Sequence, residues 1–187
     1  MNLQSLPKVL LHDHLDGGVR PATVIELANE YGYTKLPTTD IDDLAAWFNS
    51  GAKRNDLVLY LETFAHTVGV MQHRDAIERV ACECAQDLAA DGVVYAEVRM
   101  APELCTEAGL THDEAVAAML DGFRRGAAGT DLTIYLICSA MRTAAQSRDR
   151  RAGGSLARRR RRRFRHRRRR GGVPAYATPR RFRVRPQ

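Results

Sequence analysis

The stretch Val93–Arg99, which reads VVYAEVR, decides how this sequence folds. Its β-branched and aromatic residues are typical of a strand, and Gly92 stands where a preceding helix over 74–90 would end. A second strand is expected over 132–138 (LTIYLIC). A helix of 15 or so residues fits between the two strands, so they are expected to lie parallel.

The residues upstream of this pair continue the pattern. Lys8–His12 (KVLLH) is a short apolar run of the kind that forms a buried strand. Helices are expected over 21–32 and 56–71, and another is expected to start at Thr39, because Thr39 and Asp42 resemble a capping box.

The order is therefore strand, helices, strand, helix, strand, which favours a parallel α/β sheet. The helix before the last strand is opened by a second capping box, Thr111 with Glu114, and runs to about Gly126. A closed (β/α)₈ barrel needs eight strands and typically about 250 residues. We therefore expect the first three strands and their helices of an incomplete TIM-type (β/α)₈ barrel.

Charge divides the chain into two parts near residue 147. Residues 1–147 carry 11 Lys and Arg against 21 Asp and Glu, whereas residues 148–187 carry 18 Arg, no Lys and one acid, Asp149. We expect 1–147 to be the globular part. Residues 148–187 are expected to be an Arg-rich, low-complexity and disordered tail.

Several classes of protein are excluded. No apolar run approaches the roughly 18–20 residues of a transmembrane helix. The first seven residues lack the pattern of a signal peptide. Four cysteines without a CxxC pair indicate reduced thiols, and the chain is expected to be cytoplasmic and without a membrane partner.

The residues that carry chemistry are His12 and His14, at the end of the first strand. Alternate residues of a strand point to the same side, so both imidazoles can face one point while Asp13 faces away. Two neutral imidazoles are a natural pair of zinc ligands. The alternative is two incidental histidines at the end of a strand.

Three segments resemble the adenosine deaminase family. Lys8–Gly18 (KVLLHDHLDGG) is similar to its opening motif K-x-x-L-H-x-H-L-D-G, and 94–102 and 138–142 are similar to its second and third strand segments. The resemblance implies a (β/α)₈ enzyme that uses one zinc ion to hydrolyse adenosine or deoxyadenosine to inosine or deoxyinosine and ammonia in purine salvage. Adenine or another purine is the alternative substrate, although Asp16 favours a small-molecule nucleoside.

The resemblance also implies roles for individual residues. His12 and His14 match the first two zinc ligands, and His14 and Asp16 match residues beside the substrate. A pocket or lid over the purine would include Gly17, Tyr60, Leu61 and Phe64, with helix core as the alternative role for some of these. The family's third histidine, its H-A-G-E segment with the proton-handling glutamate and its D-D pair do not occur after Arg142. We therefore expect no catalytic residue in this chain, no stably held zinc and no activity.

The other histidines do not replace the missing ligands. They stand in expected helices or, in one case, among arginines, and are expected to be surface or packing residues: His66, His73, His112 and His166.

The arginine tail has two explanations. The runs within 158–170 would bind nucleic acid non-specifically through phosphates. Alternatively, the tail is translated in the wrong frame of a GC-rich gene. Read one nucleotide later, 164–172 allow FDIAGAEAG, which resembles the family motif G-x-D-L-A-G-x-E, and 148–154 allow EIAELA. We expect a frame shift near 145–148, which would leave 1–147 as a truncated family member.

Overall fold

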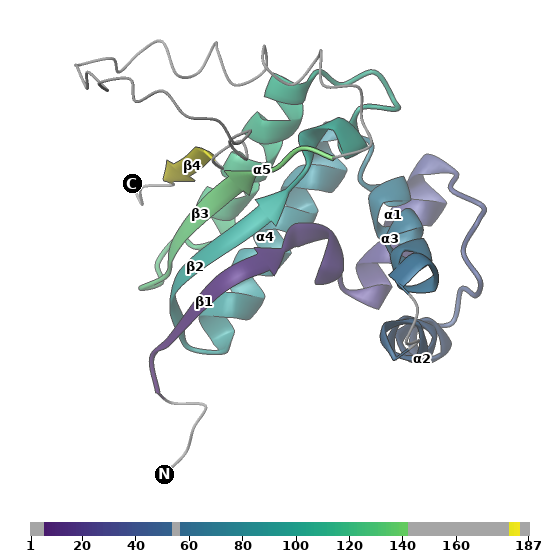
Figure 1. The fold of residues 1–187 in the computed structure, drawn as a ribbon, viewed down its shortest axis with the longest axis horizontal. Helices are drawn as coiled ribbons and strands as arrows, with labels where there is room; N and C mark the ends of the chain where they lie inside the picture. The colour runs from purple at the N-terminus through teal and green to yellow at the C-terminus, as the bar shows by residue number, and fades with distance from the viewer. Residues whose placement is uncertain (1–5, 54–56, 142–179, 184–187) are drawn as a thin grey trace, which may run out of the picture.

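The computed structural model describes residues 6–53, 57–141 and 180–183. Within them, a four-stranded sheet has the order β1-β2-β3-β4. The first three strands are β1 (Lys8–His14), β2 (Val93–Met100) and β3 (Thr133–Cys138). They run parallel and adjacent in chain order (Figure 1), which confirms the expected parallel arrangement.

The two parallel ladders differ in regularity. β2 and β3 stay in step from Tyr95 opposite Thr133 to Met100 opposite Cys138. The ladder between β1 and β2 shifts register twice. The first shift lies between Lys8 and Val9, and the second lies between Leu10 and Asp13, in the middle of β1. This second shift falls beside the histidines and shapes the site described below.

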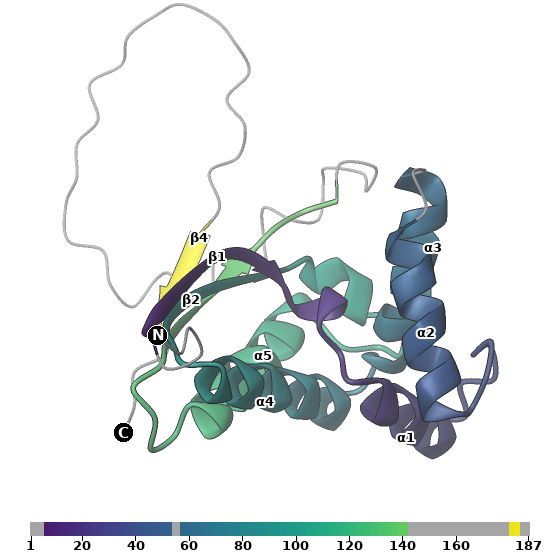
Figure 2. The same cartoon turned by 90° about the horizontal axis from the view of Figure 1, so that it is seen from below.

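Helices α4 (Arg74–Ala90) and α5 (His112–Gly126) cover one face of the sheet (Figure 2). The predicted capping box is present, because Thr111 accepts from the Glu114 amide while the Glu114 carboxylate accepts from the Thr111 amide. Gly122 allows the two helices to touch, since a Cβ there would lie 2.3 Å from the carbonyl oxygen of Glu78. The core between these helices and the strands is built from large, fully buried side chains that include Ile77, Met100, Met119, Phe123, Ile134 and Leu136.

Three further helices lie to one side of the sheet: α1 (Pro21–Tyr31), α2 (Ile41–Ala52) and α3 (Leu57–Val70). The predicted start of α2 at Thr39 is wrong by one residue. Asp40 is the cap, and its side chain accepts from the amides of Asp42 and Asp43. The Asp40 carboxylate accepts both hydrogen bonds at once, and its negative charge is stabilised by the positive end of the helix dipole. It is therefore a better N-cap than the Thr39 hydroxyl.

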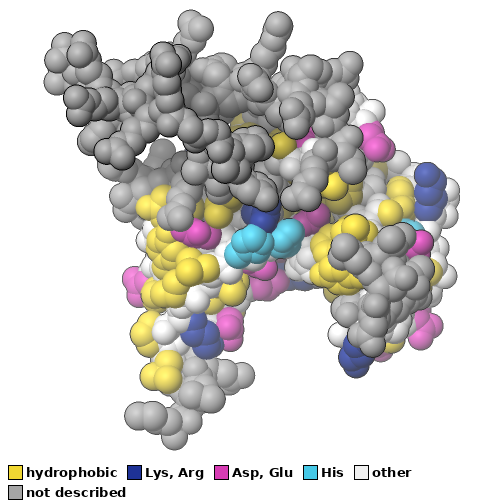
Figure 3. Space-filling model, viewed as in Figure 1, with side chains coloured by type: hydrophobic (Ala, Val, Ile, Leu, Met, Phe, Trp, Pro, Cys, Tyr) yellow, Lys and Arg dark blue, Asp and Glu magenta, His cyan; other side chains and the backbone are white. Residues whose placement is uncertain are grey.

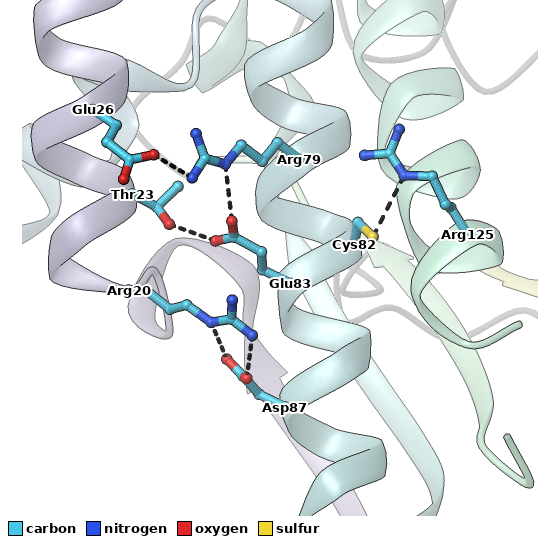
Figure 4. A network of polar contacts seen from close by, with 8 residues as sticks. All are labelled: Arg20, Thr23, Glu26, Arg79, Cys82, Glu83, Asp87 and Arg125. Atoms are coloured by element: carbon cyan, nitrogen blue, oxygen red, sulfur yellow. Dashed lines mark hydrogen bonds and ion pairs between the residues drawn. The ribbon is translucent and has the colours of Figure 1, made fainter.

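Polar contacts fix α1 to α4 (Figure 4). They cross from the start of α1 to the outer face of α4 and pair Arg20 with Asp87, Thr23 with Glu83, and Glu26 with Arg79. On the opposite side of α4, the Arg125 guanidinium donates to the Cys82 sulfur. The helices beside the sheet are thus tied to the layer that covers it.

Four residues of the expected disordered tail form a strand. β4 (Arg180–Arg183) pairs antiparallel with β3, from Tyr135 opposite Arg183 to Cys138 opposite Arg180. The expectation of disorder is therefore wrong for these four residues. The physical reason is that β3 would be the edge strand of the sheet without β4. Its outward backbone N–H and C=O groups can pair with an extended segment of the chain. The rest of 142–187 lies outside the described residues.

No helix in the described part of the chain is long and apolar enough to cross a membrane. The four cysteines are free thiols, as predicted. Burial raises the pKa of the Cys84 and Cys105 thiols to about 12, and that of Cys138 to about 11. These three thiols are therefore protonated at neutral pH.

Candidate active site

The site lies where β1 ends. Between the pairs Leu10–Ala96 and Asp13–Val98, β1 contains two residues and β2 only one, so β1 carries a bulge. His12 lies in this bulge with a φ of 62°, the left-handed region that side chains other than glycine rarely adopt. Such a conformation costs of the order of 1–3 kcal/mol and is typical of functional sites.

The two predicted histidines lie close together at the end of β1. The ring centres of His12 and His14 are 5.5 Å apart and the ring planes are tilted by 54°. Two imidazoles on one tetrahedral zinc ion have ring centres about 5 Å apart, given Zn–N bonds of about 2 Å. Figure 3 shows histidine side chains on the open face of the molecule, beside an apolar area over the strands.

Arg99 of β2 completes this cluster. Its Nη1 lies 2.7 Å from Nε2 of His12 and 3.5 Å from Nδ1 of the same ring. Arg99 stands directly opposite His14 in the parallel ladder. Sequence reasoning missed Arg99. The available signal was that Arg99 follows Glu97 by two residues, so both lie on the same face of an expected strand.

Asp16 follows in a short 3-10 turn, η2 (Leu15–Gly17). The residue is buried, and its Oδ1 lies 3.7 Å from Nδ1 of His14. That same Oδ1 has no hydrogen-bond partner among the described residues. Burial raises the pKa of the Asp16 carboxyl above its ordinary value, against the opposing effects of a backbone hydrogen bond and of His14 and Arg99. A buried acceptor of this kind is normally satisfied by a donor.

A pocket of about 290 Å³ opens beside Asp16. Four of the predicted site residues line it: Asp16, Gly17, Tyr60 and Phe64. The rings of Tyr60 and Phe64 meet edge to face at 5.1 Å and form one apolar wall. Leu61 does not line the pocket and is 52% exposed. A Cβ on Gly17 would touch the Phe64 ring at 3.5 Å, so any side chain there would narrow the pocket.

Further wall residues come from α2 and α3, namely Ala45, Phe48, Asn49, Thr63 and Thr67. The two threonines are buried, and each hydroxyl donates to a carbonyl of its own helix, that of Tyr60 and that of Phe64. Sequence reasoning missed them. Their spacing of four residues on a mostly apolar helix was the available signal.

The remaining histidines lie elsewhere, as expected for packing residues. His73 stacks on Tyr31 with ring centres 4.0 Å apart. His66 packs against Tyr33 and Trp47. His112 is the first residue of α5. His166 lies outside the described residues.

The donor set suits a zinc ion only in part. His12 and His14 are residue types that bind zinc, and their ring centres lie 5.5 Å apart. The described residues contain no group of three or more His, Cys, Asp or Glu that could hold a metal ion. Any further ligands must therefore come from outside 6–53, 57–141 and 180–183.

Comparison with known sequences gives one family. The profile of the family described as "Adenosine deaminase" matches residues 7–164. An adenosine deaminase of Mycolicibacterium gilvum is 56% identical over 153 residues, which cover 79% of this chain and 42% of that protein. The chain thus spans about two fifths of the length of the curated relatives it matches.

Comparison with solved structures gives the same fold. An amidohydrolase of Burkholderia ambifaria with bound zinc matches with a TM-score of 0.58 and 28% identity, over 73% of this chain and 36% of that one. An Arabidopsis N6-mAMP deaminase matches with a TM-score of 0.51 and 28% identity, over 65% and 35%. These are TIM-type folds, so the three parallel strands and their helices are part of a (β/α)₈ barrel.

Proposed function

The chain belongs to the adenosine deaminase family, a family of hydrolases, and we propose that residues 1–147 are the N-terminal part of a cytoplasmic enzyme of purine salvage. The reaction proposed is the hydrolysis of adenosine or deoxyadenosine. Water adds at C6 of the purine, the bond from C6 to the amino nitrogen breaks, and inosine or deoxyinosine and ammonia leave. Identity of 56% with an enzyme named for adenosine favours this substrate.

The observation that carries the proposal is the unpartnered oxygen of Asp16 at the edge of the pocket. A buried carboxylate oxygen without a donor destabilises the fold unless a ligand supplies the donor. A ribose hydroxyl is such a donor. The apolar wall of Tyr60 and Phe64 offers a surface on which a purine ring can pack.

His12 and His14 would hold the zinc ion. Bound zinc supplies a water whose pKa is lowered towards 7 and which can act as a nucleophile. Among the described residues no group of three or more His, Cys, Asp or Glu could hold a metal ion. The sequence after Arg142 also lacks the H-A-G-E segment that carries the family's proton-handling glutamate. We therefore expect the 187-residue chain to have no deaminase activity by itself.

A chimera tests the proposal directly. Residues 1–147 would replace the matching N-terminal part of the Mycolicibacterium gilvum relative, which supplies the rest of the barrel. We expect the chimera to convert adenosine to inosine and the 187-residue chain to release no ammonia. Asp16→Asn in the chimera is expected to lower kcat/KM about 10- to 100-fold, the value of a hydrogen bond to a charged group.

Asp13→Asn is the matched control, because Asp13 is a neighbouring carboxylate that does not line the pocket. A folded chimera that prefers adenine or N6-methyl-AMP to adenosine would contradict the substrate. Zinc-dependent inosine production by the unmodified 187-residue chain would contradict the proposed inactivity.

We also propose that 148–187 are translated in a shifted frame. The composition of this segment supports the proposal, since all 18 of its basic residues are Arg and none is Lys. Resequencing the coding DNA across codons 140–190, with about 500 nucleotides beyond, should reveal one missing or extra base. An unaltered frame would instead favour a true arginine tail, whose retention on polyanions should fall with salt.

A further inference from the structure

The buried amide of Gln72 joins two parts of the chain that are distant in sequence. Gln72 follows the end of α3 and is 8% exposed. Its Nε2 donates to the carbonyl oxygen of Val68, in the last turn of α3, at 2.8 Å and to that of Leu104, in η3 (Pro102–Cys105), at 2.9 Å. Its Oε1 accepts from the Glu107 amide at 2.9 Å. Gln72 therefore fixes the end of α3 to the segment that follows β2.

The hydrogen bonds of this side chain select one arrangement of its neighbours. Nε2 uses both of its donors, and Oε1 accepts from a backbone amide on the same segment. Desolvation of a buried amide offsets most of what its hydrogen bonds contribute to stability. Such a fully bonded group mainly specifies geometry. Gln72 thus defines where the end of α3 lies relative to η3.

The helix that Gln72 anchors also carries one wall of the pocket. Four residues of α3 line the pocket, the first being Tyr60 and the last Thr67. Thr67 directly precedes Val68, whose carbonyl accepts from Gln72. The wall therefore begins at the anchored end of α3 and extends away from it.

Small rotations at the anchor have larger effects at the far end of the wall. Tyr60 lies eight residues before Val68, which is about 12 Å along the helix axis. A rotation of α3 by about 5° at Val68 would therefore move Tyr60 by about 1 Å. A gap of that size removes roughly a quarter to a half of the attraction between packed atoms. The contacts of Gln72 thus control how closely this wall packs on a ligand.

We propose that Gln72 is a positioning residue of the pocket, which holds α3 so that the wall of Tyr60 and Phe64 packs on a purine nucleoside beside Asp16. This role rests on the proposed function, since it takes the nucleoside as the ligand. A clamp with a structural role alone would change the stability of the chain and leave its affinity for the nucleoside unchanged.

Binding of adenosine to the 187-residue chain tests this role at equilibrium, because the chain is expected not to convert adenosine. ¹⁵N–¹H spectra recorded during an adenosine titration give the Kd. Gln72→Met fills a similar volume without the amide and should raise the Kd at least about tenfold. Gln86→Met is the matched control, since Gln86 is an exposed glutamine of α4, and it should leave the Kd unchanged. Circular dichroism establishes that each variant is folded.

A double-mutant cycle shows whether Gln72 acts through the wall. Phe64→Ala removes a ring of the wall and should itself raise the Kd about tenfold. Added to Phe64→Ala, Gln72→Met should raise the Kd by less than about threefold, because the ring that it positions is gone. An equal effect of Gln72→Met with and without Phe64 overturns the proposal. A folded Gln72→Met chain with an unchanged Kd overturns it as well.

A second measurement needs no variant and decides the question where Gln72→Met does not fold. Coupling between two sites is reciprocal, so adenosine packed on the wall should tighten the contacts of Gln72. The amide hydrogen of Glu107, which is donated to Gln72, should exchange at least about threefold more slowly in saturating adenosine, although Glu107 does not line the pocket. Amides of α5 should exchange as before. Unchanged exchange at Glu107 contradicts the proposed role.

The role of Gln72 and the proposed function fail in different ways. If the unmodified chain and Gln72→Met bind adenosine equally well, the role of Gln72 is wrong and the proposed function stands. If the unmodified chain binds no adenosine, the proposed nucleoside pocket is wrong, and the role of Gln72 is wrong with it.

Discussion

Gly122 of α5 lies directly against the backbone of Glu78 in α4. A Cβ on Gly122 would be 2.3 Å from the Glu78 carbonyl oxygen and 2.7 Å from the Cβ of Ala81. Because the first of these neighbours is backbone, it cannot rotate away. The close packing of α5 on α4 therefore requires a residue without a side chain at this position.

The first prediction follows from this contact. Gly122→Ala should lower the free energy of unfolding by about 1–3 kcal/mol, because the helices must separate to admit the methyl group. Urea unfolding followed by circular dichroism measures the change. Gly18→Ala is the control, since nothing lies within 4 Å of a Cβ there and its φ is −111°, and it should stay within about 0.5 kcal/mol. Equal losses in both variants would contradict the prediction.

Elements set by local signals were predictable from the sequence. The bounds 74–90 of α4 and the capping box at Thr111 depend on residues close in the chain, and the structure confirms both. The bulge at His12 was not predictable, because it exists only in the pairing of β1 with β2, about 85 residues later. The same pairing brings Arg99 to His12, so a side-chain pattern along one strand could not reveal it.

The pocket residues also divide into those that a local motif identifies and those that depend on contacts between distant parts of the chain. Asp16 and Gly17 follow the first strand directly, so a motif at the end of β1 was enough to identify them. Thr63 and Thr67 line the pocket because α3 packs beside α2, where a Cβ on Gly51 would lie 2.3 Å from the Thr63 methyl. Nothing local to Thr63 indicates this neighbour. Tyr60 and Phe64 of the same helix were identified through the family resemblance, whereas the two threonines beside them were missed.

The second prediction concerns pH. Burial lowers the pKa of His66, whose Nδ1 lies 3.0 Å from the hydroxyl of Tyr33. Below the ordinary pKa of about 6.5 the unfolded chain therefore binds more protons at this residue than the folded chain. His66 thus makes the free energy of unfolding rise with pH up to about 6.5 and level off above it.

His66→Phe removes this contribution. Urea unfolding at pH 5 and pH 7.5 should show a smaller loss of stability on acidification for His66→Phe than for the unmodified chain. Tyr33→Phe keeps the buried imidazole and should keep the full slope. The same slope in all three chains would show that His66 does not titrate below its ordinary range.

The third prediction concerns the contacts between α1 and α4 (Figure 4). Arg79 pairs with Glu26 of α1 at 2.5 Å and with Glu83 of its own helix at 2.9 Å. Arg79→Met should cost less than about 1 kcal/mol, because exposed ion pairs contribute little. Its main effect should be faster amide exchange in α1, while α5 exchanges as before. Arg124→Met, which breaks a pair within α5, is the control and should leave α1 unchanged.

The fourth prediction links the site to stability. The Asp16 carboxylate is buried with one oxygen unpartnered, and burial raises its pKa above the ordinary value. Between the ordinary pKa of about 3.9 and the raised value, the folded chain binds more protons, so the stability falls as pH rises through this window. Asp16→Asn removes the charge and should raise the free energy of unfolding at pH 7 by about 0.5–2 kcal/mol, as expected for a residue kept for function.

The gain from Asp16→Asn should disappear below about pH 3.9, where the carboxyl is protonated in both states. Urea unfolding of the two chains at pH 3.5 and pH 7 measures the difference. Asp13→Asn, at a residue that does not line the pocket, is the control and should show no comparable gain. If Asp16→Asn were less stable at pH 7 than the unmodified chain, the carboxylate would have a stabilising partner, and the vacant acceptor proposed for a ribose hydroxyl would not exist.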